Sequence, residues 1–490
     1  MMPRALPVAA AVLFAAAALV SACTHSPGGR AAGSGDERRL EPEPGAPVVV
    51  AARAVCHLIA DNPDSAVAKV TGADGAPSVV VDGRAYWFFG DTVRTGPGGR
   101  QDVIPAALAT STDTDGSDCV RLDFKKAGGL AQPMFPRLEE TTAWPDGILP
   151  LDDGSIVFYM VKVTRESPFA WHVSSVGLGR MDARSLEGTR TVEAIWDERS
   201  GFRARVAGVR SPVRHGDDVV VYIRTDDGAN YVAKAPLSRI GERDAYVYWD
   251  GAQWSPRPQD AQPMWPVSRE SGFPADNGVS VTFDKRSGRW LAIYNGDLAT
   301  IDARTAPDPW GPWSEPVTWL DCRPLSGAAY PFCYSAEIHR ELSQDGATAY
   351  VTFSGQKPYD VSLVELHFGV AIHEWRAAGG DLRYAAASPG RDYTDTGVAF
   401  YASDRPGPGL APVFAADDGT YTLDAGDGEP AFYTYAAAPS AGLVLTQPVF
   451  RYSNGGHEAL DAGSRPGWQR GEVAFYAACA TPSENTGCTP

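Results

Sequence analysis

Between residues 48 and 375 the sequence repeats one pattern: a short β-branched or alternating segment, a Gly-containing pair, and another such segment. An Asp-Gly pair between two runs of this kind is a strong signal for a tight hairpin turn. No sustained helical period competes with this pattern. Repeated hairpins predict an all-β domain, either a β-propeller or a large β-sandwich. The turn pairs are Asp82-Gly83, Asp153-Gly154, Asp227-Gly228, Ser287-Gly288 and Asp345-Gly346.

The C-terminal part of the chain carries a different internal repeat. The tripeptide Ala-Phe-Tyr occurs at residues 399, 431 and 474, and Pro-Val-Phe stands between the copies. Because a repeat predicts similar units that share a core, we expect a small β-module of about three units at residues 384–488, after a linker at 376–383. The module resembles aromatic repeats appended to secreted bacterial hydrolases, which implies glycan or wall binding. A structural cap or spacer is the alternative.

The N-terminus has the pattern of an export signal. Arg4 precedes an apolar run over residues 9–20, which is too short to span a bilayer and fits a signal-peptide core. The run ends in Val-Ser-Ala-Cys23, which resembles a bacterial lipobox and implies diacylation of Cys23. We therefore expect a signal peptide at residues 1–23 and a flexible tether at 24–47. The predicted location is the outer face of the bacterial cell membrane; plain secretory cleavage is the alternative.

The cysteines support export. Of the 7 cysteines, six remain after Cys23, and an even number in an exported chain indicates disulfides. Short spacing favours two of the possible bridges, and the third follows from the residues left over. No Cys-x-x-Cys occurs, so we expect no zinc site, no other metal site and no cofactor. The predicted bridges are Cys322–Cys333, Cys479–Cys488 and Cys56–Cys119.

The charge balance excludes several kinds of partner. The chain has 43 Lys and Arg against 60 Asp and Glu, a net charge of −17. An acidic protein is repelled by phosphate backbones and anionic lipid surfaces. We therefore expect no nucleic-acid partner, membrane contact only through the N-terminal lipid, and a monomer. Gly-x-Ser-x-Gly, His-Glu-x-x-His and phosphate-loop motifs are absent from the sequence.

Two aspartates flank the first hairpin of the predicted domain. If Asp82-Gly83 is a two-residue turn, Asp74 lies directly opposite Asp91, with Cα atoms about 4.5–5.5 Å apart. Facing like charges destabilise a sheet, but a close carboxylate pair splits its pKa values, so one acid stays protonated while the other is ionised. Cleavage of a glycosidic bond needs such a pair. We predict Asp74 and Asp91 as catalytic residues, with their roles left open.

The same hairpin also indicates where the pair lies. Pro77 fits an edge strand, and the innermost strand of a propeller blade is an edge. Both aspartates would then lie near the mouth of the central channel, together with further residues that contact the substrate. The structural alternatives are turns for the other aspartates, core packing for the tryptophan, and a strand with one exposed Glu and a satisfied His. The predicted substrate-binding residues are Trp144, Asp146, Asp276, Glu337 and His339.

Three segments resemble a bacterial family first catalogued as domain of unknown function 4185. They are Gly72-Ala73-Asp74-Gly75 followed by residues 87–92 (WFFGDT), residues 304–314 (RTAPDPWGPWS), and residues 334–343 (YSAEIHRELS). The resemblance covers residues 48–375. It implies a five-bladed propeller related in shape to furanosidases, and some members are endo-D-arabinanases. The positions that match their catalytic carboxylates are Asp74 and Asp91.

Two functions remain open from the sequence. The first is an exported, lipid-anchored glycoside hydrolase that cuts a furanose-rich, arabinan-like polysaccharide with two carboxylates. The second is a non-catalytic carbohydrate-binding or envelope scaffold protein that uses the propeller mouth and the aromatic C-terminal repeats. Both predict a polysaccharide as the partner.

Overall fold

The structure is a computed structural model that describes residues 47–479, except 135–140, 168–169, 267–277, 298, 327–331, 344–347, 357, 417–418, 425–427 and 440–441. The predicted lipobox with Cys23, the tether and Cys488 therefore lie outside the described residues. Within the described part of the chain, no helix is both long and apolar enough to cross a membrane.

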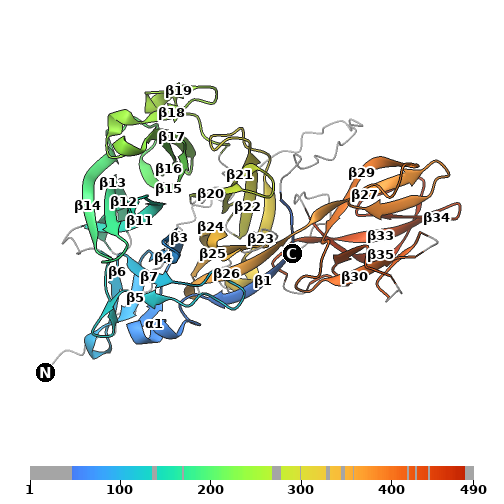
Figure 1. The fold of residues 1–490 in the computed structure, drawn as a ribbon, viewed down its shortest axis with the longest axis horizontal. Coiled ribbons are helices and arrows are strands. Elements are labelled where there is room, and N and C mark those ends of the chain that lie inside the picture. Colours follow the sequence, from blue (N-terminus) through green and yellow to red (C-terminus); the bar gives the residue numbers. More distant parts are fainter. Residues whose placement is uncertain are drawn as a thin grey trace, which may run out of the picture.

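Five antiparallel sheets of four or five strands form a ring (Figure 1). The first contains β3 (Gly75–Val81), β4 (Arg84–Phe89), β7 (Ala107–Ser111) and β8 (Asp123–Phe124); the second contains β11 (Thr141–Pro150), β12 (Ser155–Ser167), β13 (Ala170–Asp182) and β14 (Gly188–Asp197). The third contains β15 (Val206–His215), β16 (Asp218–Thr225), β17 (Asn230–Pro236), β18 (Val247–Trp249) and β19 (Trp254–Ser255). The fourth contains β20 (Val279–Asp284), β21 (Arg289–Asn295), β22 (Thr300–Ala306) and β23 (Val317–Asp321); the fifth contains β24 (Cys333–His339), β25 (Thr348–Gln356), β26 (Tyr359–Phe368) and β1 (Val49–His57).

The ring closes through the innermost strands. β3 contacts β11, β11 contacts β15, β15 contacts β20, β20 contacts β24, and β24 contacts β3 again. Each of these strands is an edge of its own sheet, as Pro77 predicted for β3. β1 pairs with β26, so the N-terminal strand completes the outer edge of the last sheet. This ring is a β-propeller, and these sheets are blades of it.

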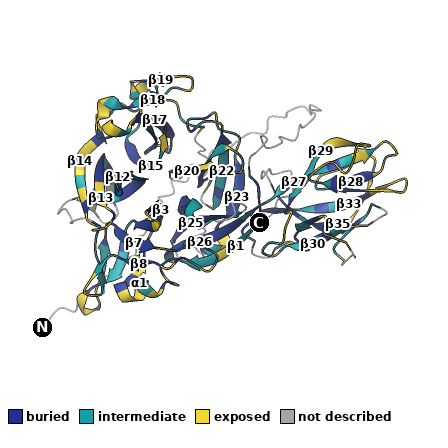
Figure 2. Ribbon diagram, in the orientation of Figure 1, coloured by how far each residue is buried: buried dark blue, intermediate teal, exposed yellow. Residues whose placement is uncertain are grey.

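Apolar side chains fill the spaces between neighbouring sheets. Tyr159 on β12, Trp196 on β14 and Val221 on β16 belong to one buried cluster that joins the second and third sheets. Figure 2 shows that exposed residues gather on outer strands such as β14. In β14, exposed positions alternate with partly buried ones over residues 189–193, which matches a strand that has one face toward the core. Burial between blades therefore holds the innermost strands in place.

Small elements complete the first blade and the loops. A three-stranded sheet contains β2 (Val70–Gly72), β5 (Thr92–Thr95) and β6 (Gln101–Ile104). β2 precedes the first hairpin in the chain, and β5 and β6 follow it. The others are α1 (Pro63–Ala68), α2 (Arg323–Ser326), β9 (Lys126–Ala127), β10 (Leu130–Ala131), and the 3-10 helices η1 (Pro97–Gly99), η2 (Leu237–Arg239), η3 (Arg243–Ala245), η4 (Pro258–Asp260) and η5 (Arg340–Leu342).

The C-terminal module consists of three units with the same connectivity. In each unit a first strand forms a hairpin with a second strand, and a third strand returns along the other side of the first. The β-repeat that the sequence predicted is therefore present. The units are β27 (Val370–Ala377), β28 (Leu382–Ala385) and β29 (Tyr393–Ala402); β30 (Ala411–Ala415), β31 (Tyr421–Thr422) and β32 (Phe432–Thr434); and β33 (Thr446–Asn454), β34 (His457–Asp461) and β35 (Gln469–Ala478).

The repeated Ala-Phe-Tyr motif supplies the centre of this module. Phe400, Phe432 and Phe475 are buried and pack edge to face, with ring centroids 5.2–5.6 Å apart. Each Phe is paired across the ladder with the corresponding apolar residue of the first strand, as in the pair Phe432 and Val413. Edge-to-face rings fit the quadrupole of aromatic side chains. The sequence repeat is thus a repeat of core positions.

The linker predicted at residues 376–383 is wrong. β27 already pairs with β28 and β29, so the module begins at Val370, directly after β26. Gly379-Gly380 forms the hairpin turn of the first unit, where the N–H of Gly380 donates to the carbonyl of Ala377 at 2.9 Å. Gly380 has φ +93°, which explains the glycine without a flexible connection.

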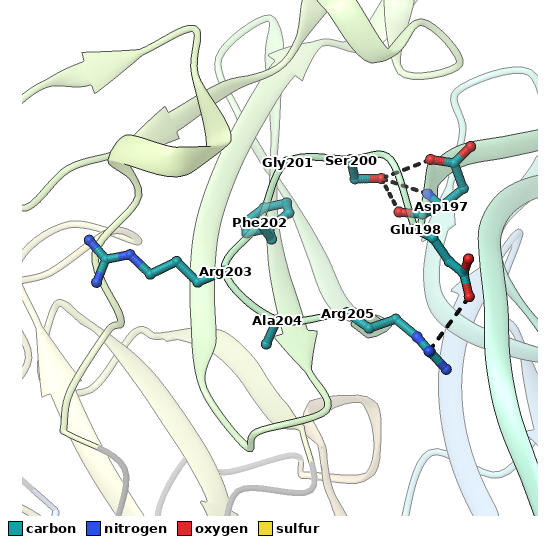
Figure 3. Close-up of a pocket in the computed structure, with 8 residues that line it drawn as sticks. All are labelled: Asp197, Glu198, Ser200, Gly201, Phe202, Arg203, Ala204 and Arg205. Carbon is teal, nitrogen blue, oxygen red and sulfur yellow. Dashed lines mark hydrogen bonds and ion pairs between the residues drawn. The ribbon is translucent and has the colours of Figure 1, made fainter.

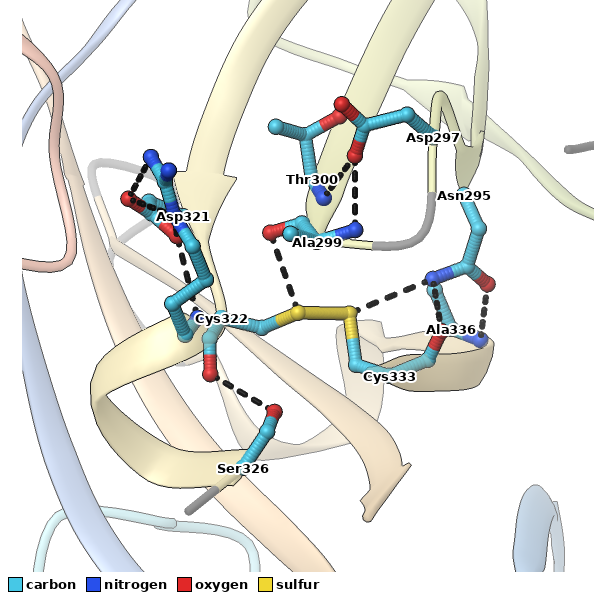
Figure 4. The surroundings of a disulfide bond; sticks show 10 residues. Asn295, Asp297, Ala299, Thr300, Asp321, Cys322, Ser326, Cys333 and Ala336 are labelled. Carbon is cyan, nitrogen blue, oxygen red and sulfur yellow. Dashed lines mark hydrogen bonds and ion pairs between the residues drawn. A yellow bond between two sulfur atoms is a disulfide. The ribbon is translucent and has the colours of Figure 1, made fainter. Parts of the chain in front are cut away.

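Two of the predicted disulfides are present. Cys56 and Cys119 join β1 to the loop before β8, and Cys322 and Cys333 join the residue after β23 to the first residue of β24. The second bridge is held by neighbouring polar groups, since Asn295 donates its amide N–H to the carbonyl of Cys333 at 3.1 Å (Figure 4). Cys479 is also disulfide-bonded.

Candidate active site

Asp74 and Asp91 lie at the two ends of the first hairpin, but they do not face each other across it. The ladder follows the predicted register from Val81–Arg84 to Ser78–Trp87, and then a bulge shifts it by one residue. The N–H of Gly90, and not that of Asp91, donates to the carbonyl of Asp74 at 2.8 Å. The predicted direct opposition is therefore wrong, because a bulge inserts one extra residue into β3.

The two carboxylates nevertheless interact. Burial, and after it the negative charge of Asp91, raise the pKa of Asp74 to about 7. Tyr334 on β24 donates its hydroxyl to Asp74 Oδ2 at 3.0 Å, which favours the ionised form and opposes this rise. A Cβ atom at Gly90 would overlap the Asp74 carboxylate, so the glycine is needed where the carboxylate passes. Asp74 is thus partly buried, and its surroundings favour the protonated carboxyl group more than water does.

Asp91 is positioned by residues of two other sheets. Trp144 on β11 donates its indole N–H to Asp91 Oδ1 at 2.9 Å. Tyr359, the first residue of β26, donates its hydroxyl to the backbone carbonyl of Asp91 at 2.7 Å and also hydrogen-bonds Asp74. An N–H donor stabilises a carboxylate in its ionised form. The two aspartates therefore have different surroundings, and Trp144 lies at the site and not only in the core.

Arg210 joins Asp146 and Glu337 beside this pair. Its Nε is 2.6 Å from Asp146 Oδ1 and its Nη1 is 2.9 Å from Glu337 Oε1. Burial alone would lower the pKa of Arg210, but the charges of Asp146, Glu337 and Asp74 raise it. Burial also raises the pKa of both carboxyl groups, and Arg210 counteracts this rise. Arg210 thus balances two buried acids, with Arg224 also acting on Asp146, and it lies close enough to Asp74 to act on its charge.

Bulges interrupt the innermost strands beside these side chains. Such a bulge occurs in four of the five strands, each beside or within a run that carries a site residue. A bulge re-aims a side chain and relaxes the strict alternation of a strand. Three bulges hold a non-glycine residue at positive φ: Ala76 (+127°), Ser211 (+40°) and Ser335 (+52°). Backbone strain of this kind collects at functional sites. The bulges lie at 75–78, 145–148, 210–213 and 334–337.

Two other predicted substrate-binding residues have different outcomes. His339 is buried, stacks on Trp87 with ring centroids 4.6 Å apart, and hydrogen-bonds Ser78 and Thr352 at 2.7 Å each. It therefore matches the satisfied structural histidine that was the alternative. Asp276 lies outside the described residues.

The sequence analysis missed three residues that shape this site, namely Arg210, Tyr334 and Tyr359. Each comes from a different strand from the two aspartates, and only contacts between sheets reveal it. Tyr334 belongs to one of the segments that resembled the family, so a signal was present there. A buried Arg opposite two acidic residues carries no local pattern.

An open pocket of about 360 Å³ lies elsewhere, between β14 and β15. Figure 3 shows that Phe202 and Arg203 point away from the polar side chains of Asp197 and Ser200. None of the predicted catalytic or substrate-binding residues lines it. In the described ranges, no group of three or more His, Cys, Asp or Glu residues is placed to hold a metal ion. The carboxylate pair therefore remains the candidate site.

Comparisons with known proteins place the chain. No curated protein matches it. Among solved structures, the catalytic domain of a GH62 α-L-arabinofuranosidase from Coprinopsis cinerea is 11% identical, with 66% of this chain and 98% of that chain covered and a TM-score of 0.41. An endo-arabinase from Bacteroides thetaiotaomicron is 9% identical, with 64% of this chain and 97% of that chain covered and a TM-score of 0.36. An exo-β-1,3-galactanase from Clostridium thermocellum is 10% identical, with 89% of this chain and 88% of that chain covered and a TM-score of 0.41.

One family profile matches the sequence directly. It carries the description "Domain of unknown function (DUF4185)" and matches residues 60–365, which include Asp74, Asp91, Asp146, Arg210 and Glu337. The match spans more than half of the 490 residues. The chain belongs to the DUF4185 family.

Proposed function

We propose that the protein is a glycoside hydrolase in which Asp74 is the general acid and Asp91 is the base or nucleophile. The observation that carries this proposal is the position of the Asp74 carboxyl group, which is buried beside the charge of Asp91 so that its pKa is raised to about 7. A general acid must hold its proton near the working pH, whereas its partner must be ionised. Burial keeps the proton on Asp74, and the indole N–H of Trp144 favours charge on Asp91.

The proposed reaction uses the two groups in turn. Asp74 donates its proton to the glycosidic oxygen as the bond to the leaving sugar breaks, and Asp91 either attacks the anomeric carbon or removes a proton from the attacking water. Tyr334 holds Asp74 in place and can still donate its hydroxyl hydrogen when Asp74 becomes a carboxylate. It would therefore stabilise the charge that forms on Asp74 as its proton leaves.

Arg210 has a positioning role in this proposal. It holds Asp146 and Glu337 beside Asp74, and its charge limits the rise of the Asp74 pKa. We propose Trp144, Asp146 and Glu337 as residues of the substrate-binding region, with Asp276 and His339 as the remaining sequence-based candidates. The buried His339 already has two close hydrogen-bond partners, so a structural role fits it better.

The proposed substrate is a furanose-rich, arabinan-like polysaccharide. Support comes from the sequence resemblance to family members that cut arabinan. We further propose that the protein is exported and anchored through a lipid on Cys23, with the C-terminal module as a wall-binding unit. The disulfides Cys56–Cys119 and Cys322–Cys333 favour an oxidising compartment.

Sugar release tests the proposal. Wild type should release reducing ends from arabinan or arabinogalactan, and Asp74→Asn and Asp91→Asn should each lower the rate at least about 100-fold. Asp82→Asn changes an exposed carboxyl group at the turn of the same hairpin and is the matched control. The rate should fall as the pH rises through about 7, since Asp74 then loses its proton.

Two results would contradict the proposal. If both variants released sugar at the rate of Asp82→Asn, the pair would not be catalytic. If wild type released nothing from these polymers but still bound them, the protein would be a non-catalytic carbohydrate-binding propeller.

A further inference from the structure

A group of aromatic side chains lies between the third and fourth blades and takes no part in the site above. Trp249 on β18, Trp254 on β19 and Trp310 after β22 lie close together, with ring centroids 5.2, 5.4 and 6.1 Å apart. His215 lies 5.2 Å from Trp310, and Phe283 lies 5.5 Å from Trp290. We call this group the aromatic platform: His215, Trp249, Trp254, Phe283, Trp290 and Trp310.

The platform differs from the core in its exposure. Trp87, Trp196 and Trp319 are completely buried. The four platform tryptophans are only half-buried, His215 is exposed, and Phe283 is 44% exposed. Large apolar side chains that gather at the surface indicate a binding site more often than isolated ones do. Packing within the protein therefore accounts for only part of this group.

The platform lies toward the opposite end of the channel from the candidate active site. Tyr334, near the start of β24, contacts Asp74. Arg340, just after the same strand, forms an ion pair at 2.8 Å with Asp284, the neighbour of Phe283. Arg340 follows Tyr334 by six positions, and six residues of extended chain span about 20 Å. A ligand on the platform would therefore leave the two catalytic candidates free.

The polar groups beside the platform favour an uncharged ligand. Lys234 pairs with Asp218 at 2.8 Å, and its Nζ lies 4.9 Å from the centre of the Trp254 ring. These two charges offset each other, so the half-buried aromatic side chains lie beside a neutral pair of groups that can hydrogen-bond. A sugar ring has the matching shape, with an apolar C–H face and hydroxyl groups at its edge.

We propose that the aromatic platform binds a segment of a neutral polysaccharide chain. The identity of the polymer, an arabinan-like chain, rests on the proposed function, whereas binding at the platform does not require hydrolysis. A second contact point on the propeller would raise the effective concentration of the polymer at the active site. This gain in effective concentration should appear with long polysaccharide chains. It should disappear with oligosaccharides that are too short to reach both the aromatic platform and the active site.

Affinity electrophoresis through gels that contain soluble linear arabinan, or arabinogalactan, tests binding. Asp91→Asn is the parent, so that the polymer is not cut during the run. Adding Trp254→Ala, Phe283→Ala and Trp290→Ala should raise the dissociation constant at least about 10-fold, and Phe283→Ala alone should raise it several-fold. Val80→Ala removes an equally exposed apolar side chain (42%) from the first blade and should change nothing. Thermal melting of each variant checks the fold.

The outcomes separate this inference from the proposed function. Equal retardation of the platform variants and the Val80→Ala control would overturn the inference. It would also be overturned if neither arabinan nor arabinogalactan retarded the Asp91→Asn parent. With Asp91 intact, the platform variants should lose activity on the polymer and keep it on short arabino-oligosaccharides. If no preparation cuts any substrate but retardation still depends on the platform, the proposed function fails and the platform remains a binding site.

Discussion

Replacing Asp74 by asparagine should make the protein more stable at alkaline pH while it abolishes sugar release. An acid whose pKa rises from 3.8 in the unfolded chain to about 7 in the fold binds its proton more tightly when folded. Its contribution to the free energy of unfolding is fully present below about pH 4 and is lost as the pH rises to about 7. At about 1.36 kcal/mol per pH unit, the loss approaches about 4 kcal/mol above pH 7. The asparagine variant carries no such penalty, because an amide never ionises.

Urea unfolding at pH 5 and pH 8 measures this effect. At pH 5 roughly a third of the penalty has developed, and at pH 8 nearly all of it has. The stability advantage of Asp74→Asn over wild type should therefore grow by about 2–3 kcal/mol between the two pH values. Comparing two pH values cancels the constant effects of the amide, such as a changed hydrogen bond with Tyr334.

Two further variants make this test specific. Asp91→Asn removes the repulsion that contributes to the raised pKa, so the pH dependence due to Asp74 should shrink. Asp82→Asn should behave like wild type, since Asp82 is exposed. An advantage of Asp74→Asn that is equal at pH 5 and pH 8 would refute the reasoning, because it would mean that Asp74 is ionised in the fold at both values.

Three other changes probe the surroundings of the site. Arg210→Met should lower the free energy of unfolding by about 3–5 kcal/mol, because it removes the cation that pairs with two buried carboxyl groups. Urea unfolding measures this loss, and a loss below about 1 kcal/mol would contradict the ion network. Replacing Cys322 and Cys333 by Ala should cost about 3 kcal/mol, because the unfolded chain loses the constraint of the closed loop. Thermal melting measures this cost without reductant, and in reductant, which opens every bridge, the variant and wild type should melt alike. Gly90→Ala should reduce sugar release about 100-fold with little loss of melting temperature, because the added methyl group displaces the Asp74 carboxylate; full activity would show that the carboxylate can move without consequence.

The sequence predicted those features that depend on neighbouring residues. The Asp82-Gly83 turn set the register of the first hairpin, and Pro77 indicated that β3 is an edge. The Ala-Phe-Tyr repeats predicted three similar units, and spacing predicted the bridge Cys322–Cys333. In each case the signal lies in a short stretch of chain, where turn chemistry and strand alternation act directly.

The features that the sequence did not predict depend on register and on distant contacts. One extra residue in β3 moved Asp91 out of direct opposition to Asp74. Gly75 and Pro77 both suit a bulge, but Pro77 suits an edge strand equally well, so the sequence alone does not choose between the two registers. Arg210 meets Glu337 across 127 positions of the chain, so no local pattern joins them. Gly379-Gly380 has the composition of a linker, because a tight turn and a flexible connection favour the same residues.

The bulges in the innermost strands have a consequence for how the chemistry of such a ring can change. Outside these bulges the ladders of β3, β11 and β24 continue with regular pairing, and β15 has one further shift at residues 206–208, so each interruption is confined to a few residues. Substitutions at these residues alter the lining while the outer strands keep the ring assembled. A family built on this plan can therefore acquire new substrates, or lose catalysis entirely, by replacing a handful of inward-facing side chains on an unchanged frame.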